Sequence, residues 1–449
     1  MLILERRLGR MIEINDKVNC SGCTACYAVC PQSAIEMKLD EEGFKYPWVD
    51  KNRCVECGLC NSVCPILNKR KIGEENTSGY IVQNKNDSIR LKSTSGAAVN
   101  AIAEYVISCG GVVFGCEFSD DRVCRHTMAT DISDLGKFQG SKYVQSELGD
   151  CFKSIKEQLD ADKKVLFIGM PCQVAGLESY IKRNKENLYL MDLACHGVPS
   201  PGVFKDFIQF LEHKYKGKIS NFVFRDKTYG YSATNIKVYF ANGKTIDCRN
   251  DIKTFTRLMF KGITLRPSCY ECAFKTKHRV SDITIFDCAL VGSYNKDMDD
   301  DIGTTSILCH SDKGKKLLEQ PDVIDKMRIK SVDSEELILT EGSMLIASAK
   351  KSENREAFFH DRELMTYEQL TNKYAPITLK MIIGDIVKRS LRYTGPIGKA
   401  VILYNKKKSI EKYKECIFNC NKRFKNLWLQ FFLSQNQGFM RLFEKTVLK

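Results

Sequence analysis

The feature that most constrains this chain is a cysteine pattern that occurs twice near its start. Each run reads C-x2-C-x2-C-x3-C-P, and the second run begins 34 residues after the first. The cysteines of the two runs are Cys20, Cys23, Cys26 and Cys30, then Cys54, Cys57, Cys60 and Cys64. The chain has 21 cysteines in 449 residues, which indicates metal binding in a reducing compartment and not a secreted disulfide scaffold.

This spacing is typical of bacterial ferredoxins that hold two [4Fe-4S] clusters. Three thiolates two residues apart wrap one face of a cluster, and the fourth cysteine of each run binds the other cluster. We therefore expect one cluster on Cys20, Cys23, Cys26 and Cys64, and a second on Cys54, Cys57, Cys60 and Cys30. Structural zinc commonly uses two CxxC pairs, which leaves the triplets and the trailing Cys-Pro unexplained.

Residues 11–68 are predicted to form this 2[4Fe-4S] ferredoxin-type domain, with a hairpin between the cysteine runs and a polar linker after them. Either Met1 or Met11 suits the start of the protein, because Met11 opens the first expected strand. We find no secretory signal and no apolar stretch of about 18 residues, so we expect a cytoplasmic protein.

An α/β body is predicted next, in two regions, 79–158 and 160–345. The loop Ser93-Thr94-Ser95-Gly96 precedes an apolar helix at 97–107, and the free N–H groups of such a loop can hold the pyrophosphate of a dinucleotide. An ordinary helix N-cap explains the same residues.

Two later strands, 164–168 and 188–193, are each followed by a cysteine, Cys172 and Cys195. Ligands bind at the carboxyl edge of such sheets, although two core cysteines would give the same pattern. With the CxxC pair Cys269 and Cys272 they would complete a four-thiolate site on turns, which we interpret as a third [4Fe-4S] cluster. Cys288 competes as fourth ligand, and the remaining cysteines are expected to be buried apolar residues.

As an ordered set, the motifs of the body resemble those of the coenzyme F420 hydrogenase/dehydrogenase beta-subunit family, in the form with an N-terminal two-cluster ferredoxin. The resemblance covers residues 11–345. The matching stretches are Ser93–Gly96, Gly140–Ser146, Pro171–Leu177, Cys195–Pro201, Phe224–Lys227, Arg266–Cys272 and Arg279–Thr284.

The resemblance implies FAD, a [4Fe-4S] cluster in the body, and electron transfer between flavin, clusters and a substrate. Family substrates include coenzyme F420 and, in a plant enzyme, a chlorophyll side chain. Many bacterial members with the ferredoxin resemble proteins of polysaccharide assembly beside pyruvyl-transferase-like partners. Two departures, Ala97 in place of a second glycine and Phe286–Leu290 in place of Gly-Asp-Phe-Trp-Gly, put coenzyme F420 itself in doubt.

The flavin residues that we carry over are Ser93, Thr94, Ser95, Gly96, Ser141, Lys142, Tyr143 and Arg266. Lys142 and Arg266 are candidates for the flavin phosphates or an anionic substrate, or are solvated surface charges. His196 is the candidate catalytic proton donor, and a structural role in the Cys-His-Gly turn is its alternative.

The net charge of +14 lies in the C-terminal tail. Residues 371–449 carry 17 Lys and Arg against 4 Asp and Glu, whereas the rest of the chain carries 52 against 51. We expect a basic helical tail over 372–449 that covers the core, lies on the inner face of a membrane, or docks a partner enzyme. No nucleic-acid-binding fold accompanies the charge.

The sequence therefore predicts an α+β protein: a two-cluster ferredoxin fold, an α/β flavin-binding body and a basic helical tail. The expected function is a cytoplasmic iron–sulfur flavoprotein oxidoreductase that exchanges electrons with a redox partner protein. The alternatives are a non-catalytic electron-transfer subunit of a larger complex and an accessory factor in polysaccharide assembly.

Overall fold

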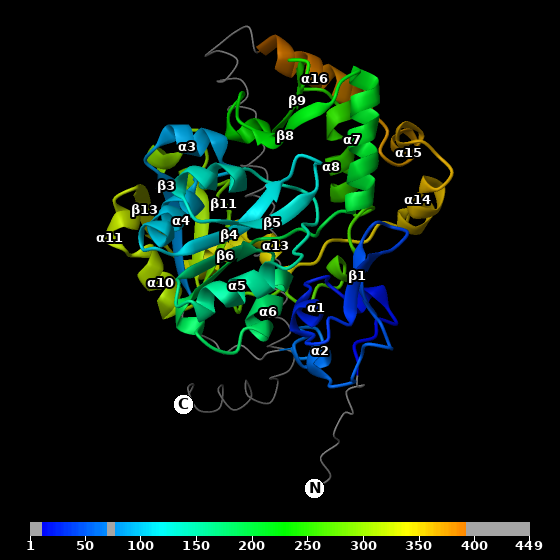
Figure 1. Ribbon diagram of the computed structural model, residues 1–449. Coiled ribbons are helices and arrows are strands. Elements are labelled where there is room, and N and C mark those ends of the chain that lie inside the picture. The colour runs from blue at the N-terminus through cyan, green and yellow to red at the C-terminus, as the bar shows by residue number, and fades with distance from the viewer. Residues whose placement is uncertain (1–10, 70–76, 392–449) are drawn as a thin grey trace, which may run out of the picture. The chain divides into compact units, whose positions relative to one another are not determined.

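The computed structural model describes residues 11–69 and 77–391 (Figure 1), and it describes the side chains as far as Asp385. The N-terminal unit consists of two short helices and a hairpin. Helix α1 (Ala25–Val29) lies in the first cysteine run and α2 (Leu59–Ser62) in the second. Strand β1 (Ile35–Leu39) pairs antiparallel with β2 (Lys45–Val49), which confirms the expected hairpin.

The two cysteine runs share an unusual backbone conformation at matched positions. Gly22 and Glu56, each two residues after the first cysteine of a run, have φ of 71° and 52°. Thr24 and Gly58, each directly after the second cysteine, have φ of 61° and 73°. The left-handed conformation costs a non-glycine residue about 1 kcal/mol or more. The same conformation occurs at matched positions of both runs, although the residue types differ. We infer that the path of the loop around its thiols determines these φ angles, and not the residue type.

An eight-stranded sheet forms the centre of the body, in the order β13-β3-β12-β11-β7-β6-β4-β5. Strands β4, β6, β7 and β11 are parallel neighbours, and the pairings of β3, β5, β12 and β13 are antiparallel. The strands are β3 (Ser78–Asn84), β4 (Val112–Phe118), β5 (Cys124–Ala129), β6 (Val165–Gly169), β7 (Leu188–Leu193), β11 (Ile283–Asp287), β12 (Thr305–Cys309) and β13 (Met327–Val332). Both predicted regions of the body contribute strands, so their limits fall within one sheet.

Helices cover both faces of this sheet. Successive residues of a strand point to opposite faces, so neighbouring residues of one strand pack against different helices. Val112 and Phe114 pack with α5 (Cys151–Asp160) and α6 (Pro171–Tyr180), whereas Val113 packs with α4 (Ala98–Ser108). The body is therefore an α/β sandwich, as expected. The other helices beside the sheet are α3 (Asp87–Lys92), α9 (Val291–Tyr294), α10 (Asp312–Leu318), α11 (Pro321–Ile324), α12 (Ser334–Glu341) and α13 (Ser343–Ile346).

A second, three-stranded sheet carries an aromatic core. Strands β8 (Ile219–Asp226), β9 (Asn235–Phe240) and β10 (Thr245–Asp247) are joined in the order β10-β9-β8. Phenylalanines of this sheet pack on α7 (Pro201–Tyr215) and α8 (Thr254–Phe260). Strands β9 and β10 pair antiparallel, and the turn between them contains Asn242 and Gly243.

The hairpin of the N-terminal unit is held against the body by a buried ion pair. Arg355, on α14 (Arg355–Arg362), binds both carboxylate oxygens of Glu42, at 2.7 Å and 2.5 Å. The same guanidinium donates to the carbonyl of Leu265 at 3.1 Å. The N-terminal unit and the body thus fall in one compact unit.

The predicted tail is described only in its first part, which includes α15 (Tyr367–Tyr374) and α16 (Leu379–Leu391). The remaining tail residues, with Cys416 and Cys420, lie outside the described residues. Within residues 11–69 and 77–391, no helix is long and apolar enough to cross a membrane.

Three expectations about cysteines were wrong. Cys116 was expected to be buried and is half-buried. Cys109 is exposed, because it caps α4 directly before Gly110 and Gly111 at the surface. Cys172 lies in the first turn of α6, not on a turn before it, because Pro171 suits the first helical position and Gln173 accepts from the N–H of Met170 at 2.8 Å. Cys124, Cys151, Cys248 and Cys309 are buried as expected.

Candidate functional site

The first predicted ligand set of the N-terminal unit is brought together around Cys23 and Cys26. Burial, and to a lesser degree the neighbouring thiols of Cys20 and Cys64, raise the pKa of Cys23 to about 12. The same two neighbours, with Cys23, raise the pKa of Cys26, after burial as the main cause. Four crowded thiolates, of which Cys23 is buried and the other three are half-buried, need a cation to neutralise them, and these residues therefore fit the expected cluster.

The second predicted set lines a small cavity of about 20 Å³. Its four cysteines are Cys30, Cys54, Cys57 and Cys60. Backbone N–H groups donate to three of the sulfurs: Ala34 to Cys30 at 3.3 Å, Glu56 to Cys54 at 3.4 Å, and Ile12 to Cys60 at 3.2 Å. Such bonds favour the thiolate form that binds iron. The geometry therefore agrees with the exchange of the fourth ligand between the runs.

The third set meets at the carboxyl edge of the central sheet. Cys172 begins α6 after β6, and Cys195 follows β7. Cys269 ends a 3-10 helix (Pro267–Cys269), and Cys272 lies three residues later. All four line one cavity of about 190 Å³. Burial raises the pKa of Cys172, and so do the other three thiols, which shows that the four sulfurs are neighbours.

The third set has the donor chemistry of a cluster site and not the spacing of a single-ion site. Among the described residues, no three His, Cys, Asp or Glu side chains are arranged to hold one metal ion. In a cubane cluster each thiolate binds a different iron atom, so the sulfurs lie farther apart than the ligands of one ion. The four-thiolate set thus fits a [4Fe-4S] cluster, and its assignment stays a prediction.

Three cationic residues, Lys69, Lys275 and Arg279, line this cavity. Lys275 donates to the carbonyl of Cys195 and, at 2.5 Å, to that of Met344. Arg279 pairs with the buried carboxylate of Asp192 at 3.0 Å. Burial lowers the pKa of Lys275, and the thiols of Cys195 and Cys272 oppose that shift. Sequence reasoning missed Lys275, although its position three residues after the CxxC pair was a usable signal.

His196, the predicted proton donor, lines the same cavity. Its Nε2 is buried and has no hydrogen-bond partner among the described residues, and its ring lies 5.3 Å from that of Phe260. Burial lowers the pKa of His196, and the positive charge of Lys275 lowers it further. The ring is therefore held in its neutral form beside the thiols.

A glycine brings the first and third ligand sets close together. A Cβ on Gly176 of α6 would lie 2.8 Å from the Cβ and 2.9 Å from the Sγ of Cys23. The thiol of Cys23 is correspondingly among the groups that raise the pKa of Cys172. Helix α6 therefore carries a ligand of the third set at its start and touches the first set one turn later.

The predicted flavin loop forms hydrogen bonds within the protein. Ser93 donates to the carbonyl of Ile89 at 2.9 Å, and Ser95 donates to that of Thr304 at 2.5 Å. A Cβ on Gly96 would lie 2.3 Å from the carbonyl oxygen of Val82 in strand β3, so this glycine serves strand packing.

The departure from the family pattern in the flavin loop has a visible consequence. Ala97, which takes the place of the second glycine, has φ of 60°, the left-handed conformation that favours glycine.

The second predicted flavin segment meets the first through one contact. The hydroxyls of Thr94 and Ser141 are 2.9 Å apart. Lys142 is turned inward and donates to the carbonyls of Lys137 and Gln139 at 3.0 Å and 2.9 Å. Tyr143 packs edge-on against Phe224 and Phe260. These polar groups already have protein partners, so their contacts do not support FAD binding here.

Arg266 lies between the N-terminal unit and the body, not at the flavin loop. Its side chain is fully buried and donates to the carbonyls of Cys20 and Lys45 at 2.8 Å and 3.0 Å. It also donates to Gln145 at 3.1 Å and approaches the Sγ of Cys20 at 3.6 Å. The guanidinium is thus a partner of the first cysteine set.

Cys288, the competing fourth ligand, lies elsewhere. It packs in an apolar cluster with Phe286 and Leu308, and its exposed fraction is 1%. It is not among the residues that line the third cavity.

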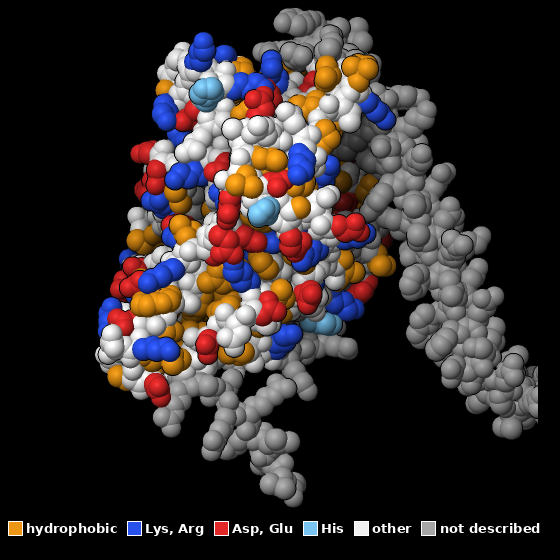
Figure 2. All heavy atoms as spheres, turned by 90° about the vertical axis from the view of Figure 1, so that its right-hand side faces the viewer, with side chains coloured by type: hydrophobic (Ala, Val, Ile, Leu, Met, Phe, Trp, Pro, Cys, Tyr) orange, Lys and Arg blue, Asp and Glu red, His pale blue; other side chains and the backbone are white. Residues whose placement is uncertain are grey.

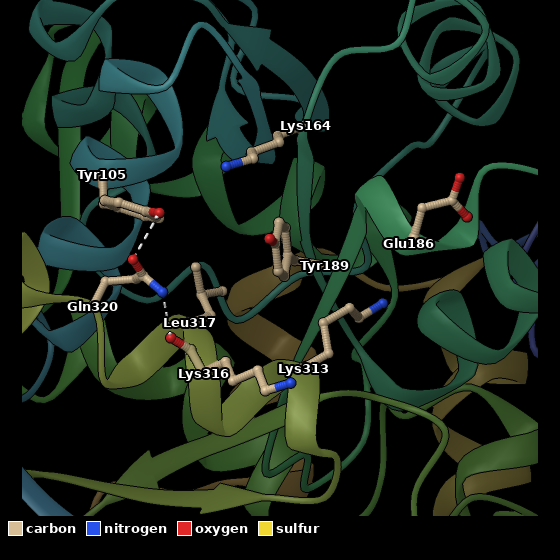
Figure 3. A pocket seen from close by; sticks show the side chains of 8 residues that line it. All are labelled: Tyr105, Lys164, Glu186, Tyr189, Lys313, Lys316, Leu317 and Gln320. Atoms are coloured by element: carbon tan, nitrogen blue, oxygen red, sulfur yellow. Dashed lines mark hydrogen bonds between the residues drawn. The ribbon is translucent and has the colours of Figure 1, made fainter.

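A separate cavity of about 380 Å³ lies at the opposite, amino edge of the sheet. Figure 3 shows its lysines, Lys164, Lys313 and Lys316, and Tyr105, whose hydroxyl donates to Gln320 at 3.0 Å. Lys164 directly precedes β6, so this cavity and the cysteines lie at opposite ends of the same strand. No predicted site residue lines it.

Charged side chains are mixed on the face that Figure 2 shows, with Lys and Arg interspersed among Asp and Glu. This agrees with the nearly balanced charge of the chain before residue 371.

Comparisons with known proteins match both parts of the chain. Residues 162–335 match the family model for the C-terminal part of the coenzyme F420 hydrogenase/dehydrogenase beta subunit. Residues 19–67 match the family described as "4Fe-4S dicluster domain".

Among curated relatives, an uncharacterised protein of Methanocaldococcus jannaschii is 26% identical over 39% of this chain and 56% of its own length. The coenzyme F420-dependent sulfite reductase of the same organism is 28% identical over 37% of this chain and 26% of its own length. The chain therefore spans only about half and about a quarter of these two relatives.

Among solved structures, a chain of the F420-reducing [NiFe] hydrogenase complex from Methanosarcina barkeri is similar with a TM-score of 0.42 and 12% identity, over 69% of this chain and 95% of that one. The two family matches thus show that residues 162–335 are similar to the C-terminal part of the coenzyme F420 hydrogenase/dehydrogenase beta subunit and that residues 19–67 are similar to 4Fe-4S dicluster domains.

Proposed function

We propose that this chain is an iron–sulfur oxidoreductase subunit that moves electrons between its ferredoxin-type unit and its α/β body. The observation that carries the proposal is the third cysteine set: four thiols from three separate segments line one cavity, and the helix that carries one of them touches Cys23. The family match over residues 162–335 supports the redox role.

The clusters, when bound, supply one-electron transfer. The chain's own residues hold the thiolates in buried loops, and backbone N–H groups donate to their sulfurs. One such bond in the third set runs from Val198 to Cys269 at 3.5 Å. Lys275 and Arg279 offset the negative charge at the sheet edge. His196 remains the predicted proton donor on its position at the cavity, whereas its lowered pKa keeps the ring neutral, the form that accepts a proton.

FAD binding at Ser93–Gly96 and Ser141–Tyr143 stays a prediction, and we derive no step through it. The bonded hydroxyls of that loop favour the second candidate function, a relay protein that holds clusters without turning over a substrate itself. Coenzyme F420 as substrate, polysaccharide-assembly enzymes as partners and contact of the tail with a membrane also stay predictions.

The test is the content of iron, sulfide and flavin per chain after anaerobic purification. About twelve irons support three clusters, whereas about eight contradict the third. One FAD per chain would support a flavoprotein oxidoreductase. The absence of FAD would favour the relay protein. Cys195→Ser should remove about four irons, whereas Cys151→Ser, a buried cysteine outside all three sets, should remove none.

A further inference from the structure

Two cysteines outside all three ligand sets form a close pair in the body. Cys116 on β4 and Cys124 on β5 are thiols whose sulfurs lie 2.9 Å apart. The strands pair Phe118 with Cys124 and Cys116 with His126, so the two cysteines are diagonal neighbours on one face of the hairpin. Diagonal side chains on one face are within reach of each other.

The surroundings of the pair make Cys116 the more acidic of the two thiols. Cys124 is 2% exposed, and Cys116 is half-buried against the same aromatic core. The hydrogen bond from Cys124 lowers the pKa of Cys116 and burial opposes this, while Lys142 lowers the pKa further. The same hydrogen bond raises the pKa of Cys124. The facing charges are those of Lys142, Glu117 and Glu147.

A short chain of contacts joins this pair to the third ligand set. Ser146 forms a hydrogen bond with the sulfur of Cys116. The amide of Gln173 donates to the hydroxyl of Ser146 at 3.0 Å, and Gln173 directly follows Cys172 in α6. The pair therefore lies two side chains away from a predicted cluster ligand.

We propose that Cys116 and Cys124 form a redox-active dithiol–disulfide couple that exchanges electrons with the iron–sulfur clusters. Reduction breaks one S–S bond and takes up two electrons and two protons to give two thiols; oxidation reverses this. The clusters deliver the electrons one at a time, so this exchange rests on the proposed function. The couple thus stores two electrons in the α/β body, beside Lys142.

The first experiment tests the couple without reference to the clusters. The full chain is equilibrated with glutathione buffers of graded redox ratio, quenched in acid, alkylated under denaturing conditions and digested with trypsin. Arg122 lies between the two cysteines, so a disulfide links peptide 93–122 to peptide 123–125. We expect this link to appear in a single two-electron transition.

Variants identify the residues of the link. It should be lost in Cys124→Ser and retained in Cys109→Ser, which removes the other cysteine of peptide 93–122. Cys151→Ser is a control for a buried cysteine without a thiol partner. Two fully alkylated thiols at every glutathione ratio would overturn the proposal.

The second experiment tests the electron exchange in the cluster-loaded protein. Air-oxidised wild type should take up two more electrons per chain from dithionite than Cys124→Ser does, at equal iron content. Equal uptake, despite the link in the first experiment, would overturn the exchange. A protein without the third cluster that still shows the link would instead contradict the proposed function and leave the couple intact.

Discussion

Gly176 shows how a single hydrogen atom at Cα lets two ligand sets approach each other. A methyl group there would lie within 2.9 Å of both Cβ and Sγ of Cys23, closer than real atoms pack, and both atoms belong to a predicted ligand. Cys23 packs in a core cluster with residues of α6, so its loop cannot move away from a larger residue 176 without displacing the thiol.

Gly176→Ala should therefore cost the protein about four irons per chain, through loss of the first cluster. Iron and sulfide analysis of the purified variant checks this. Gly384→Ala, in the exposed part of α16, is the matched control, because a Cβ there meets nothing within 4 Å. An unchanged iron content in Gly176→Ala would contradict the close packing.

Lys227 is a buried amine whose charge depends on pH near neutrality. Burial, and after it the positive charge of the neighbouring Arg90, lower its pKa to about 7. Its Nζ donates to the carbonyls of Arg90 and Ser95 at 2.7 Å and 2.9 Å. Below pH 7 the amine is charged in both the folded and the unfolded chain. Above pH 7 only the unfolded chain keeps the proton, up to about pH 10.4.

The free energy of unfolding should therefore rise with pH from 7 towards 10 by up to about 1.4 kcal/mol per unit from this group. In Lys227→Met this rise should disappear, as measured by urea unfolding at pH 7, 8 and 9. Lys92→Met, at an exposed lysine of α3, should keep the wild-type slope. Parallel profiles for wild type and Lys227→Met would show that Lys227 keeps its proton.

At the scale of elements, the turn between β1 and β2 is fixed to α14 by one buried ion pair. Arg355 is 4% exposed and Glu42 9%, and the guanidinium meets the carboxylate with two bonds. Removing one partner leaves the other charge buried without compensation, which costs more than the pair itself contributes.

Arg355→Met should lower the free energy of unfolding by about 3–5 kcal/mol. Denaturant unfolding measures the loss, and limited proteolysis should show earlier cleavage of the hairpin. The double variant Glu42→Gln with Arg355→Met should recover part of the loss, because no charge is then left buried. No recovery would mean that packing, and not the carboxylate, accounts for the effect.

The elements were largely predictable from the sequence, and the contacts between them were not. Periodicity located β6, β7 and the hairpin because each is a short apolar run between turn residues. Cysteine spacing likewise predicted that Cys64 joins the first set. Nothing local indicated that Arg266, expected at a flavin, would turn towards Cys20, because that contact joins residues 246 positions apart.

Short-range rules also explain the error at Cys172. The Gly-Met-Pro-Cys-Gln sequence was interpreted as a turn, whereas proline at the first helical position starts α6 at Pro171. The thiol therefore lies at the N-terminus of a ten-residue helix, where the backbone dipole favours a thiolate. The Cys116–Cys124 pair was missed because two cysteines eight residues apart have no fixed spacing rule until the strand register is known.

At the scale of the whole molecule, Arg266 places a positive charge of the body beside the first cysteine set of the ferredoxin-type unit. Its guanidinium is fully buried, lies 4.1 Å from the ring centroid of Tyr46, and approaches Cys20 Sγ at 3.6 Å. A reduced cluster carries one more negative charge than an oxidised one. A nearby cation and a donor to the sulfur therefore stabilise the reduced form and raise the reduction potential.

Arg266→Gln should lower the reduction potential of one of the ferredoxin-type clusters by several tens of millivolts and leave the other nearly unchanged, because only the first set contacts this residue. A redox titration followed by electron paramagnetic resonance separates the two. Arg90→Gln is the matched control: Arg90 is as deeply buried, but it pairs with Asp300 at 2.7 Å and lies outside every cysteine set. Both variants should lose stability, and only Arg266→Gln should shift a potential. Equal cluster potentials in the two variants would mean that Arg266 only holds the ferredoxin-type unit against the body. The body would then influence that unit through packing alone.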